Sequence, residues 1–237
     1  MFGVSLFGAG FRSTDAVEGA AEAYAQGFWQ CSGTIPSVHV EIAVGTSNFG
    51  AQVSYGHGRA WAKMVNRASQ WVTQHGYESR IGMAGANDIE LGWNGPAQTR
   101  RWVAGYVSVA QRPYYDFGDA AGCPPRGDCI GSWTVEDVWY VAWGARIALP
   151  LPEIYAPNGS SAQEWQRLSL YAFKHHGSAM RIAGVISQQR ACRQSADPCR
   201  GIDNSPRRAW SLLWRALNSD PRTAQDLRWS TDIRWDR

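Results

Sequence analysis

Hydrophobic and polar positions follow two different periods along the chain. Eight short segments are rich in β-branched and aromatic residues or alternate between apolar and polar positions, which is typical of β-strands. They cover residues 2–8, 38–46, 80–88, 114–120, 138–144, 149–155, 180–187 and 228–235. Longer segments with apolar residues at helical spacing separate most of them, so the pattern predicts strands that alternate with helices.

Polar residues and prolines mark where several of the predicted helices begin. Ser13, Thr14 and Asp15 open the first helix, and Pro96 suits the first turn of the third. Ser161 and Glu164 have the spacing of a capping box for the next helix, and Ser205-Pro206 begins the last one. These signals agree with the helical spacing of the apolar residues that follow them.

Strands that alternate with helices predict a mostly parallel sheet, because parallel neighbours need crossover connections. Eight strands in 237 residues favour a (β/α)8 TIM-type barrel over an open doubly wound sheet. No GxGxxG motif follows the first strand, which removes the support for a dinucleotide-binding sheet. The connections between residues 120 and 150 are too short for full crossover helices, so we expect an irregular barrel there. Without repeats or linkers, residues 1–237 are expected to form one domain.

The composition is that of a compact globular protein, with 44% hydrophobic and 18% charged residues. No run approaches the ~18 apolar residues of a membrane span, so we expect a soluble monomer without a membrane partner. A net charge of +3 and scattered arginines predict no nucleic-acid partner. The 13 tryptophans are unusually many, and Trp suits both core packing and stacking against sugar rings.

The cysteines predict two local disulfides. Cys123 and Cys129 bracket one short turn-rich loop, Cys192 and Cys199 bracket another, and no CxxC metal spacing occurs. Two disulfides imply a secreted or extracellular protein, and a cytosolic protein with five reduced cysteines is the alternative. Cys31 is left over, either as a buried thiol or as the partner of a cysteine upstream. The first residues lack the charged and apolar regions of a signal peptide.

The third predicted strand ends in acidic residues. Side chains on a strand alternate between two faces. One face carries Ile81, Met83 and Ile89, and the other carries Gly82, Ala84, Ala86, Asp88 and Glu90. In a barrel the second face points to the interior, and its end lies at the mouth where active sites form. Asp88 and Glu90 would then face a cleft, ~6–7 Å apart along the strand.

Hydrolysis of a glycosidic bond needs two carboxyl groups, one protonated as acid and one ionised as nucleophile or base. Glu153 lies near the end of another predicted strand and could join this site. We expect Glu90 to be the general acid and Glu153 or Asp88 to be the second carboxylate. Candidate substrate-binding residues near predicted strand ends are Asn87, Trp93, Asn94, Asp116, Trp143, Tyr155 and Gln188. The substrate would be a polysaccharide such as bacterial cell-wall glycan.

Each candidate also has an ordinary structural explanation. Asp88 could cap the turn after its strand, Glu153 could pair with an arginine, and His57 could stabilise a turn. The competing function is a non-catalytic barrel that binds a glycan or a protein. Carboxylates ~5–9.5 Å apart across a cleft favour catalysis, whereas acids bonded to arginines or loop amides favour binding. No HExxH or GxSxG motif occurs, so we expect no metal, cofactor or serine nucleophile.

The stretch Asp88-Ile89-Glu90 at a strand end resembles the D-x-E motif of family 25 glycoside hydrolases, which are lysozyme-like enzymes that cleave peptidoglycan. It is also similar to related glycoside-hydrolase-like bacterial domains. The resemblance implies a β/α barrel in which Glu90 is the acid and Asp88 assists or stabilises an oxazolinium or oxocarbenium ion. It covers three residues, and Val4-Ser5 lacks the acidic neighbour of the early D-V-S strand in those lysozymes.

Two weaker resemblances extend beyond this motif. Glu90 and Glu153 lie three predicted strands apart, which is similar to the two glutamates of retaining barrel glycosidases, although Asn87-Asp88 does not match their Asn-Glu pair. The longer pattern of "AVGTSN", "GANDIELGWN", "DVWYVAWGA" and "PEIY" resembles uncharacterised secreted actinobacterial proteins. That likeness implies export and assigns no activity.

Overall fold

The computed structural model describes residues 1–6, 10–33, 35, 37–195 and 199–234. The strands are β1 (Gly3–Leu6), β2 (Gly10–Ser13), β3 (Val40–Ser47), β4 (Ile81–Asp88), β5 (Tyr114–Asp116), β6 (Ala148–Pro150), β7 (Val185–Ser187) and β8 (Ser230–Asp232). The helices are α1 (Thr14–Ser32), α2 (Tyr55–Gln74), α3 (Pro96–Val107), α4 (Val135–Trp139), the π-helix η1 (Tyr140–Gly144), α5 (Ser160–His176), α6 (Gln189–Gln194) and α7 (Pro206–Asn218). The chain therefore forms a mixed α/β fold.

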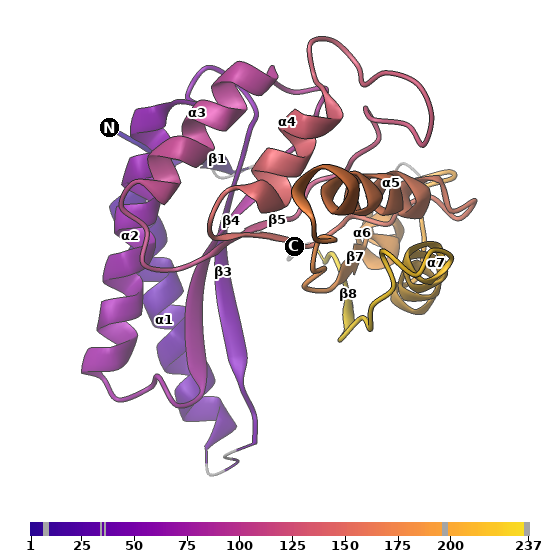
Figure 1. Cartoon of the computed structure of the whole chain (residues 1–237). Helices are drawn as coiled ribbons and strands as arrows, with labels where there is room; N and C mark the ends of the chain where they lie inside the picture. Colours follow the sequence, from indigo (N-terminus) through magenta and orange to yellow (C-terminus); the bar gives the residue numbers. More distant parts are fainter. Residues whose placement is uncertain (7–9, 34, 36, 196–198, 235–237) are drawn as a thin grey trace.

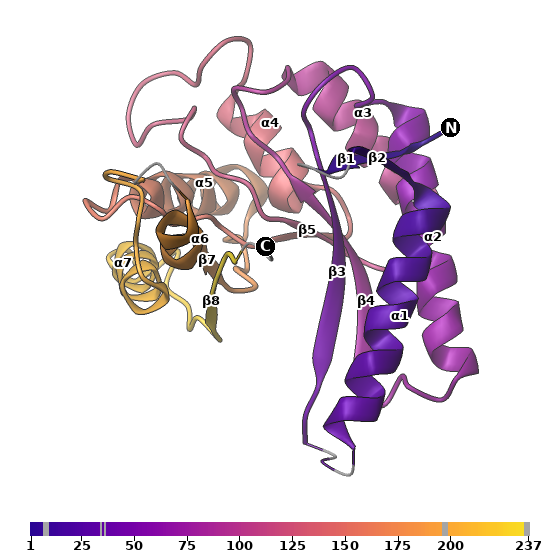
Figure 2. The same cartoon turned by 180° about the vertical axis from the view of Figure 1, so that it is seen from behind.

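Four strands form a parallel sheet in the order β3-β4-β5-β6. A single parallel bridge between Glu153 and Ile186 links the segment after β6 to β7, which pairs in parallel with β8. The helices α1, α2 and α3 lie on one side of the molecule along β3 and β4, whereas α5, α6 and α7 lie on the other, beside β7 and β8 (Figure 1). The view from behind shows the same division (Figure 2).

The described residues do not form the closed eight-stranded barrel that we expected. The first predicted strand, β1, instead pairs antiparallel with β2 in a hairpin. The predicted strand at 138–144 is also wrong, because α4 and η1 occupy this segment. Thr134 and Asp137 form a reciprocal capping box that satisfies backbone N–H groups at a helix start, and this outweighs the strand-like run of apolar residues.

The helix start signals were correct in part. Ser13 and Ser205 accept hydrogen bonds from backbone N–H groups in the first turns of α1 and α7, as predicted. The capping box of Ser161 and Glu164 is wrong, because α5 begins one residue earlier than Ser161, after Gly159 in a left-handed conformation (φ 86°). Glu164 is therefore free of a capping role and lies buried on α5.

The core lies between the helices and the parallel sheet. Trp61 on α2, Trp102 on α3 and Trp165 on α5 are all fully buried. Helices α2 and α3 approach closely because Gly58 and Gly105 lie at their crossing: a Cβ at either position would collide with the backbone of the other helix. This packing holds the helical layer against β3 and β4.

Both predicted disulfides, Cys123–Cys129 and Cys192–Cys199, are present. They fit a secreted protein, since such bonds persist in oxidising environments. Of the two alternatives for Cys31, the buried thiol is wrong, because this cysteine is free and exposed on α1. In the described part of the chain, no helix combines the length and the apolar character needed to cross a membrane.

Candidate active site

Strand β4 carries the first two acidic residues of the candidate site. Met83 is buried in the core, and Gly85 lies directly beneath the hydroxyl group of Tyr106 on α3, so this face of β4 points to the helices as predicted. Asp88 is the last residue of β4 and points to the opposite face, and Glu90 follows in a turn. The two acids therefore lie on the face opposite the helices, while Ile89 between them stays buried in the core.

Three carboxyl groups come together at the end of the parallel strands, and we call Asp88, Glu90 and Glu153 the carboxylate cluster. One oxygen atom from each residue lies within 4.8 Å of those of the other two. Glu153 is only 4% exposed and lies after β6, where the chain forms its bridge to β7. The carboxyl ends of parallel strands meet at one edge of the sheet, and this arrangement brings Glu153 to β4.

Burial keeps protons on this cluster. Burial, and next the charge of Asp119, raise the pKa of Asp88 to about 7. The same two causes, with a further contribution from Asp88, raise the pKa of Glu90 to about 8. The pKa of Glu153 is well above its ordinary value because of burial and then the charge of Asp88. At neutral pH Glu90 is therefore mostly protonated, while Asp88 is about half ionised.

No arginine or lysine forms an ion pair with the cluster among the described residues. Tyr155 instead donates a hydrogen bond to the Glu153 carboxylate, which counteracts part of the rise in the pKa of Glu153. One buried oxygen of Asp88 has no hydrogen-bond partner in the described part of the chain. Tyr155 therefore lies at the cluster, where its role in substrate binding stays a prediction, and the alternative of an arginine partner for Glu153 is not found among the described residues.

Asn48, which follows β3, holds the backbone of Glu90 in place. Its Nδ2 donates to the Glu90 carbonyl at 3.0 Å and to the Thr99 hydroxyl at 3.3 Å, while its Oδ1 accepts from the Glu90 N–H at 3.0 Å. Asn48 is fully buried. Asn48 was not among the predicted site residues, because its only signal in the sequence was a polar amide directly after a predicted strand.

Two further carboxyl groups lie close to the cluster and were not among the predicted site residues. Asp119, after β5, raises the pKa of all three cluster members. Glu164 on α5 is 7% exposed, and burial followed by the charge of Asp119 raises its pKa to about 7. The signal for Glu164 was its place beside Trp165 on the apolar side of a helix. We had instead predicted that Glu164 caps the start of that helix.

Asn87 and Asp116 point away from the face of β4 that carries Asp88. They are paired neighbours in the register of β4 and β5, and alternation along β4 puts them on the helix-facing side. Asp116 is 2% exposed and accepts the N–H of Gly118 at 3.3 Å. Asn87 is fully buried, and its two polar side-chain atoms have no partner among the described residues. The expectation that these two bind substrate directly is therefore not supported.

Trp93 lies in the turn that begins at Glu90, and its role in stacking against a sugar stays a prediction. Its N–H donates to the Glu90 carbonyl at 3.1 Å, its side chain is 41% exposed, and it meets the ring of Phe49 edge to face at 5.8 Å. Asn94 has a structural role instead, because its Nδ2 donates to the Gly50 carbonyl at 3.1 Å and joins two loops.

Trp143 lies away from the cluster, and the side chain of Gln188 is engaged in a hydrogen bond to the backbone. Trp143 lies in η1, which precedes β6 and thus lies toward the amino end of that strand, whereas the cluster lies at the carboxyl ends. Gln188 follows β7, and its Nε2 donates to the Ile202 carbonyl at 3.0 Å. The prediction of Trp143 failed because it rested on the segment being a strand.

The cluster also has the donor set of a hard cation site. Its three oxygen atoms are close enough together to share one divalent ion, and Ca²⁺ and Mg²⁺ prefer carboxylate oxygens. A bound cation would favour the ionised carboxylates and lower their pKa values. The raised pKa values given above are those of the cluster without a bound cation.

Comparison with known proteins adds no constraint on this assignment. No family model, curated protein or solved structure matches the chain. The resemblance of Asp88-Ile89-Glu90 to family 25 glycoside hydrolases therefore stays a prediction, and any function for the protein has to be argued from the carboxylate cluster itself.

Proposed function

We propose that the protein is a glycoside hydrolase that cleaves a polysaccharide by carboxylate acid–base chemistry. The observation that carries the proposal is the convergence of Asp88, Glu90 and Glu153 oxygens within 4.8 Å, without a basic partner among the described residues. Glycosidases need one protonated and one ionised carboxyl group on either side of the scissile bond. The raised pKa values favour that mixed state near neutral pH.

Glu90 is the general acid in this proposal. Its pKa of about 8 keeps it protonated at pH 7, and the exposed ring of Trp93 beside it offers a surface for a sugar. Glu90 donates its proton to the glycosidic oxygen while the bond from that oxygen to the anomeric carbon breaks. The Glu90 carboxylate then deprotonates the water that completes hydrolysis.

Glu153 or Asp88 supplies the ionised carboxylate that attacks or stabilises the anomeric carbon. For Glu153, the hydrogen bond from Tyr155 offsets only part of the rise in its pKa, whereas the pKa of Asp88, about 7, leaves about half of that carboxyl group ionised at neutral pH. A separation within 4.8 Å is closer to the ~5–5.5 Å of retaining glycosidases than to the ~6.5–9.5 Å of inverting ones. We therefore propose a retaining reaction with a glycosyl–enzyme intermediate.

The surroundings of the cluster support the same function. A barrel of parallel strands carries its active site at the carboxyl ends, and the six parallel strands β3 to β8 fit an incomplete barrel of this kind. The two disulfides fit export, and an exported hydrolase meets extracellular or cell-wall glycans. The competing proposal, a non-catalytic binding barrel, is less favoured because no arginine neutralises the cluster in the described residues.

The test is product release from purified glycans, including peptidoglycan and plant and mycobacterial polysaccharides. The native protein should release new oligosaccharides, and Glu90→Gln should reduce the rate at least ~100-fold, as expected for loss of a general acid. Glu78→Gln, an exposed glutamate after α2, is the matched control and should retain full activity. If no glycan yields a product while the protein is folded, the binding barrel replaces the hydrolase.

A further inference from the structure

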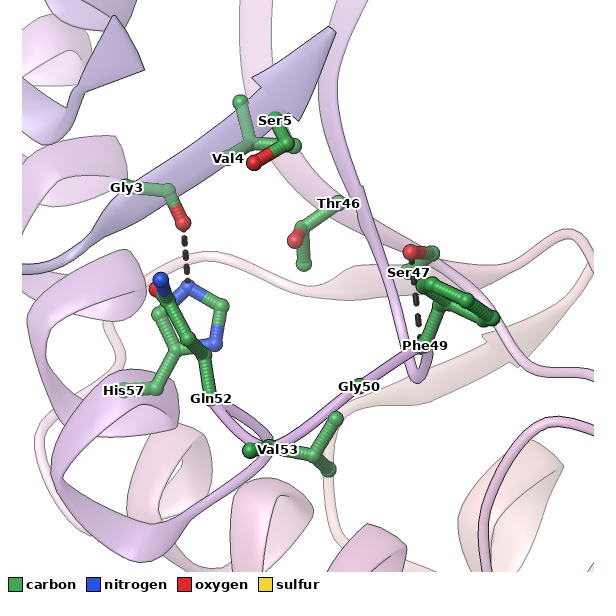
Figure 3. Close-up of a pocket in the computed structure, with 11 residues that line it drawn as sticks. Gly3, Val4, Ser5, Thr46, Ser47, Phe49, Gly50, Gln52, Val53 and His57 are labelled. Atoms are coloured by element: carbon green, nitrogen blue, oxygen red, sulfur yellow. Dashed lines mark hydrogen bonds between the residues drawn. The ribbon is translucent and has the colours of Figure 1, made fainter. Parts of the chain in front are cut away.

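A cavity of about 380 Å³ lies beside the carboxylate cluster but is not lined by it. Its walls come from the β1 strand of the N-terminal hairpin, from the end of β3 and the loop after it, and from the start of α2 (Figure 3). The volume lies within the ~300–1,000 Å³ of sites for small ligands. The mechanism proposed above does not use this cavity.

The lining offers neutral hydrogen-bonding groups. Ser5, Thr46 and Gln52 present hydroxyl and amide groups to the space between the hairpin and the loop after β3 (Figure 3). No aspartate, glutamate, lysine or arginine is among the described residues that line it. Neutral hydroxyl and amide groups suit the alternating donors and acceptors of an uncharged sugar.

His57 forms a fixed wall of this cavity. Trp102 Nε1 can only donate, so the His57 Nδ1 atom at 3.2 Å accepts, and the His57 Nε2–H donates to the Gly3 carbonyl at 3.0 Å. Burial lowers the pKa of His57, which keeps the ring neutral. Both ring nitrogens are thus engaged, and the ring holds the hairpin in place over α2.

Two exposed aromatic rings connect the lining of the cavity to the turn that begins at Glu90. Phe49 lines the cavity and is 69% exposed, and it contacts the edge of Trp93, whose N–H is bonded to Glu90. Ser47, also in the lining, is the register partner of Asp88 across β3 and β4. Exposed rings in such a row provide apolar faces on which sugar rings stack.

From this arrangement we propose that the cavity is a binding subsite for an uncharged pyranose unit, and that Phe49 and Trp93 guide the adjoining sugars to the carboxylate cluster. The proposal rests on the proposed glycosidase function and adds its substrate class. Ionised carboxyl groups of the cluster would repel an anionic sugar, whereas an uncharged one is accepted.

The test measures binding separately from turnover, by calorimetry on the Glu90→Gln protein. The probes are cellotetraose and chitotetraose as uncharged chains and tetragalacturonate as an anionic chain of the same length. At least one uncharged tetrasaccharide should bind, and Phe49→Ala and Gln52→Leu should each weaken it by roughly tenfold, as expected for loss of one stacking or hydrogen-bonding contact. Phe173→Ala, which removes a 39% exposed ring on α5, is the matched control and should leave binding unchanged.

Several results would overturn the subsite. The first is that neither uncharged chain binds, and the second is that tetragalacturonate binds more tightly than both. The third is that Phe49→Ala and Gln52→Leu both leave the affinity unchanged. The two proposals fail separately. Product release from glycans with no effect of these two substitutions removes the subsite and keeps the hydrolase, whereas binding that depends on Phe49 and Gln52 without any product keeps the subsite and removes the hydrolase.

Discussion

At the residue scale, the chemistry of this protein depends on how burial and like charges act on a few carboxyl groups. Asp88 and Glu90 are both partly buried, and each lies near Asp119. An ionised carboxylate in such a place loses water and gains a repelling neighbour, so its proton is held to higher pH. This shift makes Glu90 suitable as an acid at neutral pH.

These shifts predict how the proposed hydrolysis depends on pH. Activity should fall above about pH 8, where Glu90 loses its proton, and below about pH 7 if Asp88 is the carboxylate that must be ionised. The measurement is kcat/KM as a function of pH, with and without EDTA. EDTA should not change the profile, since the proposed mechanism uses no metal. A cation bound to the cluster would lower these pKa values, and its removal would shift the profile. An activity that stays constant well above pH 8 would exclude Glu90 as the acid.

The same shifts predict how stability depends on pH. The pKa of Glu90 is higher in the folded protein, at about 8, than in the unfolded chain, at ~4.3, so the folded state binds more protons between these values. Its contribution to stability is full below the lower value and is lost as the pH rises through the higher one. The melting temperature of the native protein should therefore fall between about pH 5 and about pH 8.5.

Glu90→Gln should reduce this fall, since glutamine carries no charge at any pH. At about pH 8.5 the variant should melt at a higher temperature than the native protein. The difference should be roughly 2–4 °C for each kcal/mol of destabilisation by the ionised Glu90 that the substitution removes. Differential scanning calorimetry at both pH values tests this, and the exposed Glu78→Gln is the control that should follow the native curve. Equal pH dependence of Glu90→Gln and native protein would contradict the assignment of the shift to Glu90.

At the element scale, the site depends on the contact between α2 and α3, which lie behind β3 and β4. Gly58 and Gly105 allow the two helix backbones to approach, and the ring of Trp102 packs within this layer. The end of β4 is tied to β3 and to α3 through the three hydrogen bonds of Asn48. A change in the helix layer should therefore reach the position of Glu90.

Gly58→Ala should destabilise the protein by about 1–3 kcal/mol, because the added Cβ collides with the Trp102 carbonyl and the helices must separate. The matched control is Gly19→Ala on α1, where the new Cβ meets nothing within 4 Å. That substitution should stabilise the protein by about 0.5–1 kcal/mol, since alanine is the better helix former. Urea unfolding measures both, and equal stability of the two variants would contradict the close packing.

At the scale of the whole molecule, two short disulfide loops restrain regions that carry little regular structure. Cys123–Cys129 lies in the long connection from β5 to α4, and Cys192–Cys199 joins the short helix α6 to the segment after it. Closing loops of this size should contribute about 2 kcal/mol each by restricting the unfolded chain. The disulfides thus add to the stability of a sheet that is not closed into a barrel in the described residues.

Replacement of Cys123 and Cys129 together by serine should lower the melting temperature by roughly 4–8 °C. Cys31→Ser is the control and should leave it unchanged, because this cysteine is free and exposed. Peptide mapping of oxidised protein without reductant should recover both disulfide-linked peptides. Recovery of all four cysteines as free thiols would contradict the bonds and the argument for export.

The sequence by itself determined those features that depend on near neighbours in the chain. The caps at Ser13 and Ser205 involve backbone groups within three residues, and the cysteines of each disulfide lie six or seven residues apart. The two faces of β4 follow from the alternation of side chains, which is a local property of any strand. The acidic end of β4 was predicted for the same reason.

Only the tertiary structure decided what depends on long-range contacts. Pairing of β1 with β2 removed one expected barrel strand, and the capped helix from Val135 removed another. The approach of Glu153 to Asp88, and of Glu164 and Asp119 to their neighbours, required the strands and α5 to be placed in space. Distances between carboxyl groups and their burial set their pKa values, and both arise from packing between segments that are far apart in the sequence.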